Sequence, residues 1–448
     1  MVENKIHKVL LFVAIVVAGA LLLSFIPDFN WKDLEFKKVD VLSDIRLNKP
    51  DAASDTLIAQ VKPQYTDTCK SGMVCIDDYS PDQNTLDRFY EALSSNRQVR
   101  IAYFGDSFIE GDLLTGSLRS LLQKKYGGNG VGFIPINCLT AGFRITTVTS
   151  AVGWGEHCLT DTSFDRKKQG ISGYYFIPQA GSTASFSCRN ESLKTDTCSE
   201  ASFYFVTDGD LKFTTTVNKQ TPEQHSAAGS PDIQKVSVRG RIGQIRMTVD
   251  NPGKNTRFFG VTLDNENTGV VVDNYSLRGI SGETLRSIPE KTLQDFDKLR
   301  TYDLIILQYG LNVATKTGNN YSYYKRGMAE TIKYLQKNLP QSAFMLVSVG
   351  DRAAKIDGEM KTMPGAGNLL ATQQAIASEC GIAFWNLIDV MALDGGMVKY
   401  VNSKPAKANL DYTHINIHGG ALIANHLFET IEYGKERYIE KKKYSEKK

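Results

Sequence analysis

Three polar residues in two short segments could together carry out acyl transfer. Ser107 lies in GDS, directly after the apolar run VRIAYF, and Asp411 and His414 lie in DYTH, shortly before the last helical stretch. A serine hydroxyl is a weak nucleophile at neutral pH, so it needs a base that removes its proton and a group that orients the base. Asp-x-x-His in a loop can place the carboxylate against one imidazole nitrogen while the other nitrogen faces the serine. The three residues are therefore candidates for nucleophile, orienting acid and base.

Two further segments offer donors for the negative oxygen that forms during such a reaction. Asn312, in YGLN, follows the apolar run DLIILQ, and an amide at the carboxyl end of a strand can point at a developing oxyanion. Gly282, in GISGET, lacks a Cβ, so its backbone N–H can approach a substrate oxygen closely. Gly279 in the same segment is the alternative glycine.

Each of these residues also has an ordinary structural interpretation. A serine at a strand-to-helix turn is typical of a helix N-cap, so Ser107 alone does not establish catalysis. Gly282 could be a turn residue, Asn312 a loop residue and His414 a helix-entry residue. His418 is a second candidate base, but it has no aspartate three residues before it.

The elements around these segments alternate between strand and helix patterns. Short apolar runs that are typical of buried strands cover 99–104, 303–308, 344–349 and 382–387. Helical patterns cover 113–122, 323–339, 368–380 and 419–431. Strands that alternate with helices predict an α/β fold whose parallel sheet is covered on both faces.

The region from 140 to 268 has a different pattern. Its runs are short, alternating and rich in β-branched residues, as in LKFTTTV and QIRMTVD, with Gly, Asn, Asp and Pro between them. Several short strands at this spacing predict an all-β insert, a sandwich of the jelly-roll kind. Such an insert is tolerated between two strands of a core when its ends lie close together.

The N-terminal part of the sequence predicts a membrane anchor. Residues 9–26, VLLFVAIVVAGALLLSFI, are uncharged and long enough to cross a hydrocarbon core as a helix. A cleaved signal peptide is the alternative, but a small-x-small cleavage site does not follow. Lysines lie close to both ends of the span, so their count does not decide which end stays inside.

The cysteine spacing favours an oxidising compartment. Cys69 with Cys75, and Cys188 with Cys198, bracket short polar loops, as local disulfides do. Unpaired thiols remain the alternative, and a third pair of Cys138 with Cys158 would leave Cys380 alone. The spacing of these cysteines is not that of a structural zinc site.

Composition and length set the remaining limits. The chain has 448 residues, 42% of them hydrophobic, and a net charge of +3. The charge is nearly balanced apart from a lysine-rich end, so nucleic acid is not an expected partner. The predicted parts are an anchor (1–26), a spacer (27–95), two parts of an α/β domain (96–139 and 269–433), the insert (140–268) and a basic tail (434–448).

In this chain order, the GDS, GISGET, YGLN and DYTH segments resemble the four motif blocks of the SGNH (GDS-type) hydrolase superfamily. The resemblance implies a flavodoxin-like three-layer fold and a mechanism without metal or cofactor. It makes Ser107 the nucleophile, His414 the base and Asp411 its partner. The backbone N–H of Ser107, with Gly282 and Asn312, would form the oxyanion hole. Phe108 departs from the Leu or His that the family often has after the serine.

The long stretches 101–135 and 384–401, with a β insert between them, look like one bacterial extracytoplasmic branch of that superfamily, which includes peptidoglycan O-acetylesterases. The resemblance implies a serine esterase that removes acetyl groups from a glycan such as peptidoglycan, with an insert like a carbohydrate-binding module. It would sit in the cytoplasmic membrane with its catalytic part on the periplasmic side. The alternatives are an O-acetyltransferase that works with a membrane-bound acyl-donor partner, and a glycan-binding protein without activity.

Overall fold

The computed structural model describes residues 29–31, 34–36, 69–190, 193, 195–265 and 268–445. The chain divides into two units, Met1–Gln60 and Val61–Lys448. In the first unit, strands β1 (Phe29–Trp31) and β2 (Leu34–Phe36) pair antiparallel. The anchor expected over 9–26 lies outside the described residues, and none of the helices that are described is long and apolar enough to cross a membrane.

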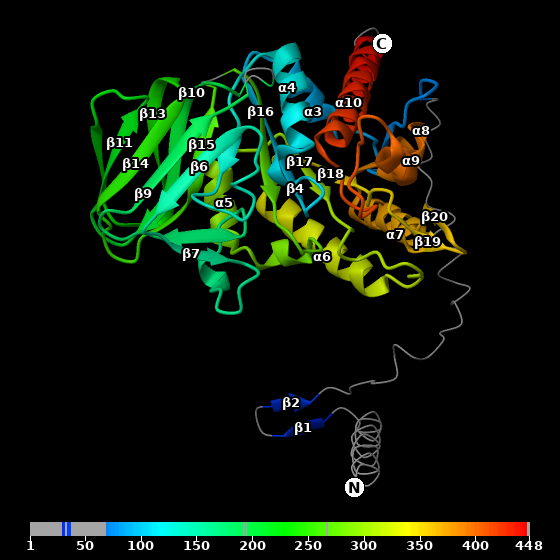
Figure 1. Cartoon of the computed structure of the whole chain (residues 1–448), viewed down its shortest axis with the longest axis horizontal. Helices are drawn as coiled ribbons and strands as arrows, with labels where there is room; N and C mark the ends of the chain where they lie inside the picture. The colour runs from blue at the N-terminus through cyan, green and yellow to red at the C-terminus, as the bar shows by residue number, and fades with distance from the viewer. Residues whose placement is uncertain are drawn as a thin grey trace. The chain divides into compact units, whose positions relative to one another are not determined.

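The centre of the second unit is a six-stranded sheet (Figure 1). Its strands lie in the order β16 (Gly269–Ser276), β4 (Gln98–Gly105), β17 (Leu304–Gln308), β18 (Ala343–Val347), β21 (Ala383–Trp385) and β3 (Ile76–Asp78). The first five strands are parallel, and β3 is an antiparallel edge strand. Numbered along the chain, the parallel strands run 2-1-3-4-5, which is the flavodoxin-like order. The predicted α/β fold is confirmed.

Helices cover both faces of this sheet, and the continuous apolar runs of its strands are buried between them (Figure 1). One face carries α3 (Asp87–Leu93), α4 (Thr115–Tyr126) and α10 (Ile417–Ser445). The other face carries α5 (Glu290–Leu299), α6 (Ser322–Asn338) and α7 (Pro364–Cys380). A strand covered on both faces is buried along its length, which explains the apolar run of β17, LIILQ. Its one polar residue, Gln308, is buried as well and accepts a hydrogen bond from the Tyr103 hydroxyl.

Several elements of the second unit have no strong sequence signal. These are the 3-10 helices η1 (Glu110–Asp112), η2 (Arg166–Lys168) and η4 (Glu283–Ser287), the hairpin of β19 (Ala353–Ile356) and β20 (Glu359–Thr362), and helices α8 (Leu387–Leu393) and α9 (Gly396–Asn402). Residues 434–445, expected as a basic tail, continue α10. Ion pairs such as Arg437 with Glu440, three residues apart, are compatible with a solvated helix.

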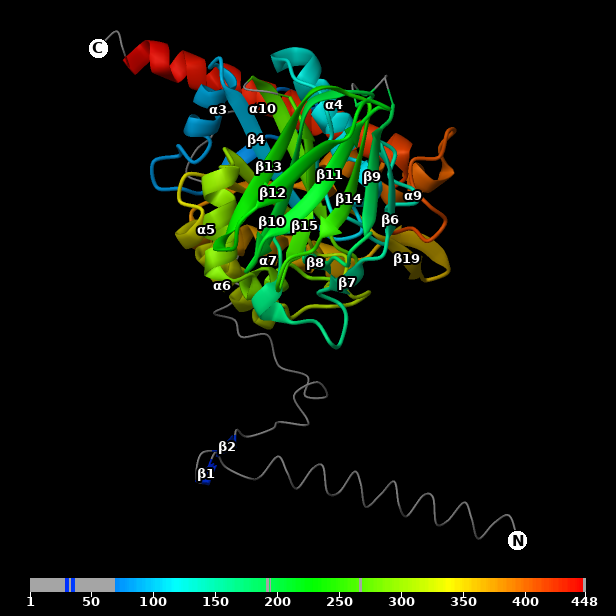
Figure 2. The ribbon, with the colours of Figure 1, turned by 90° about the vertical axis from the view of Figure 1, so that its left-hand side faces the viewer.

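The β insert consists of two antiparallel sheets (Figure 2). One sheet has the order β13 (Ser230–Ile242), β10 (Cys198–Thr207), β15 (Arg257–Asp264), β8 (Tyr174–Ile177) and β7 (Gly155–Cys158), with β5 (Gly132–Ile134) also paired to β15. The other has the order β12 (Glu223–Ala227), β11 (Leu211–Val217), β14 (Gln244–Asn251), β9 (Thr183–Cys188) and β6 (Thr147–Val152). The ring of Phe213 on β11 contacts Phe203 and Phe258 of the other sheet, so the sheets share an aromatic core.

The expected disulfides are confirmed in one of two cases. Cys69 and Cys75 form a disulfide. Cys188 and Cys198 are free thiols, so that predicted disulfide is absent from the structure, and the Cys188 thiol donates to the carbonyl of Ile242 at 3.7 Å. The other described cysteines, including Cys138 and Cys158, are free as well.

A buried charge cluster joins the insert to the central sheet. Arg300, after α5, donates to Asp273 on β16 through Nε (2.6 Å) and Nη2 (2.8 Å), and it also binds Asp264 at the end of β15. All three side chains are at most 7% exposed. Although burial acts to raise the pKa of Asp273, Arg300 holds it below its usual value. The cluster therefore links the last strand of the insert to the strand that follows it.

We expect Arg300→Met to lower the free energy of unfolding by about 3 to 5 kcal/mol, because two buried carboxylates would lose their shared counterion. Arg239→Met is the matched control, since Arg239 pairs with Glu200 at 3.0 Å with 68% of its side chain exposed. That change should cost about 1 kcal/mol or less. Urea unfolding of both variants measures the difference, and equal losses would contradict a linking role for Arg300.

Candidate active site

Ser107 lies in the turn that follows β4, at the carboxyl edge of the central sheet. Gly105, the last residue of β4, is opposite Ser276 of β16 and Gln308 of β17, so the ends of three strands meet beside this turn. The first α-helix after the turn, α4, begins only at Thr115. Ser107 is therefore not the N-cap of α4, and its hydroxyl is available for another role.

A sharp backbone turn lies between Ser107 and the start of α4. Gly111 and Asp112 have φ values of +60° and +62°, a left-handed conformation that interrupts a helix. A Cβ on Gly111 would also lie 2.8 Å from the ring of Phe143, so both the backbone conformation and the packing favour glycine here. The sequence pattern, which predicts helix from 113, did not reveal η1 or this turn.

The structure brings together the serine, histidine and aspartate that the sequence analysis selected. Ser107 Oγ lies 2.9 Å from His414 Nε2, and His414 Nδ1 lies 2.7 Å from Asp411 Oδ2. Ser107 and His414 are 307 positions apart in the sequence. The alternative base, His418, is four residues further on in α10, and its backbone N–H donates to Asn416. The geometry is that of a base held between a nucleophile and an orienting carboxylate.

Asp411 is fixed by its own loop. Its Oδ1 accepts hydrogen bonds from the backbone N–H groups of Thr413 and His414, both at 3.0 Å. Partial burial acts to raise the pKa of Asp411, but these N–H groups and the His414 ring lower it below its ordinary value. A carboxylate that stays ionised can hold the Nδ1–H tautomer of His414 and leave Nε2 free to accept the serine proton.

Asn312 and the GISGET segment lie next to each other. Asn312, in the turn after β17, donates from Nδ2 to the carbonyl of Ile280 at 2.9 Å. Gly282 has a φ of +95°, and a Cβ there would lie 2.6 Å from the ring of Tyr309. A Cβ on Gly279 would meet nothing within 4 Å. Packing therefore demands glycine at 282 and not at 279, although both have positive φ.

Asp106 is a site residue that the sequence analysis missed. It is 1% exposed, and its carboxylate accepts the N–H of Phe108 at 3.0 Å and the N–H of Leu311 at 3.2 Å. Phe108 directly follows Ser107, and Leu311 directly precedes Asn312. One buried carboxylate thus fixes the distance between the nucleophile turn and the Asn312 turn. The GDS motif contains this residue, but a hydrogen bond across 205 positions has no local sequence signal.

Arg352, directly before β19, also binds the Asn312 turn. Its Nη1 donates to the carbonyls of Leu311 (2.8 Å) and Ala314 (2.9 Å). The next residue, Ala353, donates its N–H to the carbonyl of Tyr412 in the DYTH loop at 3.1 Å. The segment after β18 therefore connects the Asn312 turn to the loop that carries His414.

Burial gives Asp106 a pH-dependent effect on stability. Loss of hydration raises its pKa from the ordinary value of 3.8 to about 6, even though the hydrogen bonds that it accepts from backbone N–H groups act to lower it. Because the unfolded chain then ionises first as the pH rises, Asp106 reduces the free energy of unfolding progressively between about pH 4 and pH 6. The difference between the two pKa values corresponds to a loss of about 3 kcal/mol in the free energy of unfolding.

Asp106→Asn removes this titration and keeps one acceptor oxygen. Relative to the wild type, the variant should become more stable by up to about 3 kcal/mol between pH 4 and pH 7, on top of a constant loss. Urea unfolding at both pH values checks this expectation. A stability difference that does not change with pH would show that Asp106 does not titrate in this way.

The sequence matches no protein-family model and no curated protein closely enough to assign a family. Among solved structures, a peptidoglycan O-acetylesterase aligns with a TM-score of 0.67 at 18% identity, over 81% of this chain and 99% of its own. Two further structures match with a TM-score of 0.26 each. One is a family two carbohydrate esterase from Cellvibrio japonicus, at 9% identity over 65% of this chain and 99% of its own. The other is a GDSL-like lipase from Parabacteroides merdae, at 18% identity over 36% of this chain and 72% of its own. The first alignment shows that this chain shares the fold of that peptidoglycan O-acetylesterase.

Proposed function

We propose that this protein is a serine esterase that removes acetyl groups from a glycan. The observation that carries the proposal is the continuous hydrogen-bond chain from Ser107 through His414 to Asp411, with separations of 2.9 and 2.7 Å. A hydroxyl in contact with an imidazole that is itself oriented by a carboxylate is the arrangement that acyl transfer requires.

In the first half of the reaction, Ser107 Oγ attacks the ester carbonyl carbon and passes its proton to His414 Nε2. Asp411 stabilises the resulting imidazolium. The carbonyl oxygen becomes negative, and the N–H groups of Ser107 and Gly282 with the amide of Asn312 are the proposed donors to it. When the carbon–oxygen bond to the sugar breaks, His414 returns the proton to the departing hydroxyl.

In the second half, water attacks the acetyl-serine, and His414 takes a proton from it. Acetate leaves as Ser107 regains its hydrogen. The same residues would serve an acetyltransferase if a glycan hydroxyl replaced water, with an acyl-donor partner in the membrane. We propose hydrolysis, because a peptidoglycan O-acetylesterase shares the fold over 99% of its own length.

The shared fold and the two-sheet β insert support an acetylated glycan, such as peptidoglycan, as the substrate class. We further propose that residues 9–26 anchor the protein in the cytoplasmic membrane and that the catalytic part lies on the periplasmic side. The Cys69–Cys75 disulfide supports an oxidising compartment.

Ser107→Ala should reduce turnover of an acetyl ester by several orders of magnitude, with little change in melting temperature, because it removes the oxygen that contacts His414 and would form the acyl-enzyme. His414→Ala should have nearly the same effect, since the residues act as a unit. Initial rates on 4-nitrophenyl acetate and on O-acetylated peptidoglycan measure both. An active Ser107→Ala enzyme would refute the proposed mechanism.

His426→Ala is a matched control for His414→Ala. His426, in α10, forms a second His–Asp pair, because its Nε2 lies 2.9 Å from Oδ2 of Asp394. His426→Ala should keep turnover near the wild-type rate. If both histidine variants lose activity equally, the loss reflects a general effect on the fold.

The proposed location has its own test. Alkaline phosphatase fused after Trp31 should be active in bacterial cells, because that enzyme needs an oxidising compartment to form its disulfides. A cytoplasmic fluorescent reporter fused at the same position should remain dark. The reverse pattern would place the catalytic part in the cytoplasm.

A further inference from the structure

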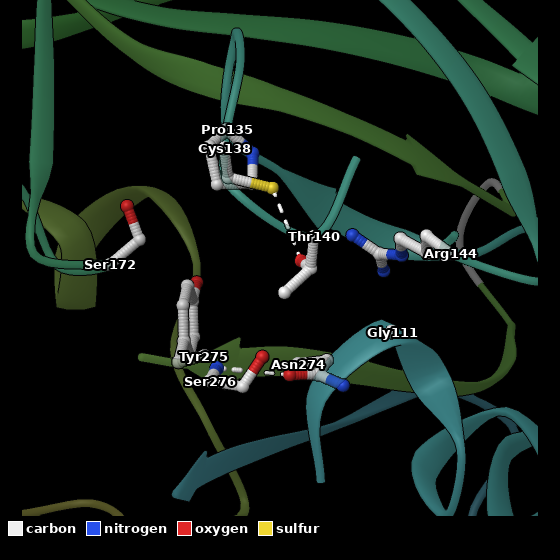
Figure 3. Close-up of a pocket in the computed structure, with 9 residues that line it drawn as sticks. All are labelled: Gly111, Pro135, Cys138, Thr140, Arg144, Ser172, Asn274, Tyr275 and Ser276. Carbon is white, nitrogen blue, oxygen red and sulfur yellow. Dashed lines mark hydrogen bonds between the residues drawn. The ribbon is translucent and has the colours of Figure 1, made fainter. Parts of the chain in front are cut away.

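A small pocket lies between η1, the end of β16 and the first part of the insert (Figure 3). Its walls come from Gly111 in η1, the end of β16 at Ser276, the chain between β5 and β6 at Thr140 and Arg144, and Ser172 before β8. It is partly open to the surface, and its volume is about 20 Å³. That volume admits one group of the size of a water molecule, so a substituent fits and a whole sugar ring does not.

Residues that line the pocket contact the turn that carries Ser107. Asn274, another of its lining residues, donates from Nδ2 to the carbonyl of Ile109 at 2.8 Å, two residues after Ser107. Ser276 is opposite Gly105, two residues before Ser107. A substrate whose ester reaches Ser107 can therefore place a neighbouring substituent here.

Two buried polar groups of the pocket lack a partner among the described residues. Arg144, which is 7% exposed, uses Nε for Asp112 (2.8 Å) and Nη1 for the carbonyl of Phe133 (3.3 Å), while its buried Nη2 has no hydrogen bond. The hydroxyl of Ser172, also 7% exposed, is equally unpaired. Figure 3 shows the Arg144 guanidinium directed toward Thr140, within the ring of lining residues. Such groups are costly unless an acceptor binds them.

The charge around Arg144 favours an anion. Asp112 is fully buried and pairs with both Arg119 and Arg144, so this group carries one positive charge in excess. Asp264 and Asp273 share the single guanidinium of Arg300, so the positive excess is local to the Asp112 cluster. A carboxylate is the glycan substituent that accepts hydrogen bonds and also carries the opposite charge.

We propose that this pocket binds a carboxylate of the glycan substrate, whose oxygens accept from Arg144 Nη2 and from the Ser172 hydroxyl. The proposal rests on the proposed esterase function for its place in catalysis. It defines the substrate class further, as an acidic glycan whose acetyl ester and carboxylate lie on the same or adjacent sugars.

Binding is measured by calorimetry on the full chain carrying Ser107→Ala, so that no turnover interferes. The probes are methyl glucuronide and its neutral counterpart, methyl glucoside. The acidic sugar should bind at least about tenfold more tightly, as expected for a hydrogen bond to a charged group. Equal affinities would overturn the proposal and would indicate that the pocket holds an ordered water only.

Arg144→Lys in the same background separates the pocket from the fold. A lysine ammonium can still reach Asp112 in place of Nε, but it has no Nη2 to place in the pocket. The preference for the acidic sugar should fall about tenfold or more. Arg119→Lys, which alters the other partner of Asp112 and does not line the pocket, should retain it. An equal fall in both variants would show that Arg144 acts only through the fold.

Ser172→Ala is a milder variant in case Arg144→Lys does not fold, and it should lower affinity for the glucuronide and leave that for the glucoside unchanged. Failure of this inference is distinct from failure of the esterase proposal. Turnover of 4-nitrophenyl acetate by the chain with Ser107 intact tests the esterase alone. Binding of the two sugars by the Ser107→Ala chain tests the pocket alone. If that chain does not prefer methyl glucuronide, the carboxylate assignment is wrong, even when the chain with Ser107 intact is an active esterase.

Discussion

The site depends on one hydrogen bond between residues that are 307 positions apart: Ser107 Oγ to His414 Nε2 at 2.9 Å. The two residues come into contact because the parallel sheet brings the carboxyl ends of its strands to one edge. Ser107 leaves β4 at that edge, and the DYTH loop reaches the same place just before α10. The contact between Ser107 and His414 therefore depends on the strand order, on the left-handed turn at Gly111 and Asp112, and on the loop that fixes Asp411.

A second layer of interactions keeps the three turns of the site in register. Asp106 accepts N–H groups from the turns of Ser107 and Asn312, Arg352 binds two carbonyls of the Asn312 turn, and Asn312 itself reaches the carbonyl of Ile280. Burial of the Asp106 carboxylate is unfavourable, as its raised pKa shows. Its position between two turns of the site provides a reason for keeping it there despite this cost. The insert is held to the same framework by buried charges, Arg144 on Asp112 and Arg300 on Asp264 and Asp273.

Much of this arrangement could be predicted from the sequence, because its signals are local. Continuous apolar runs identify β4, β17 and β18, and alternating runs identify the insert. The GDS and DYTH segments identify Ser107, Asp411 and His414. The remainder depends on contacts that a sequence does not display. Nothing in the local sequence around Asp106 and Arg144 indicates that their charged side chains are buried. Cys188 and Cys198 have disulfide spacing but remain thiols, and η1 separates Ser107 from α4 where the pattern predicts a direct strand-to-helix turn.

The most direct test of the account is to capture the covalent intermediate. The protein is mixed with an acetyl ester, quenched with acid during the first turnovers, digested and analysed by mass spectrometry. The proposed mechanism predicts the mass of one acetyl group on the peptide that contains Ser107, at a level that rises and then falls as substrate is consumed. It predicts no acetylated peptide with Ser107→Ala. Efficient turnover with the acetyl group on another residue, or with no dependence on Ser107, would contradict it.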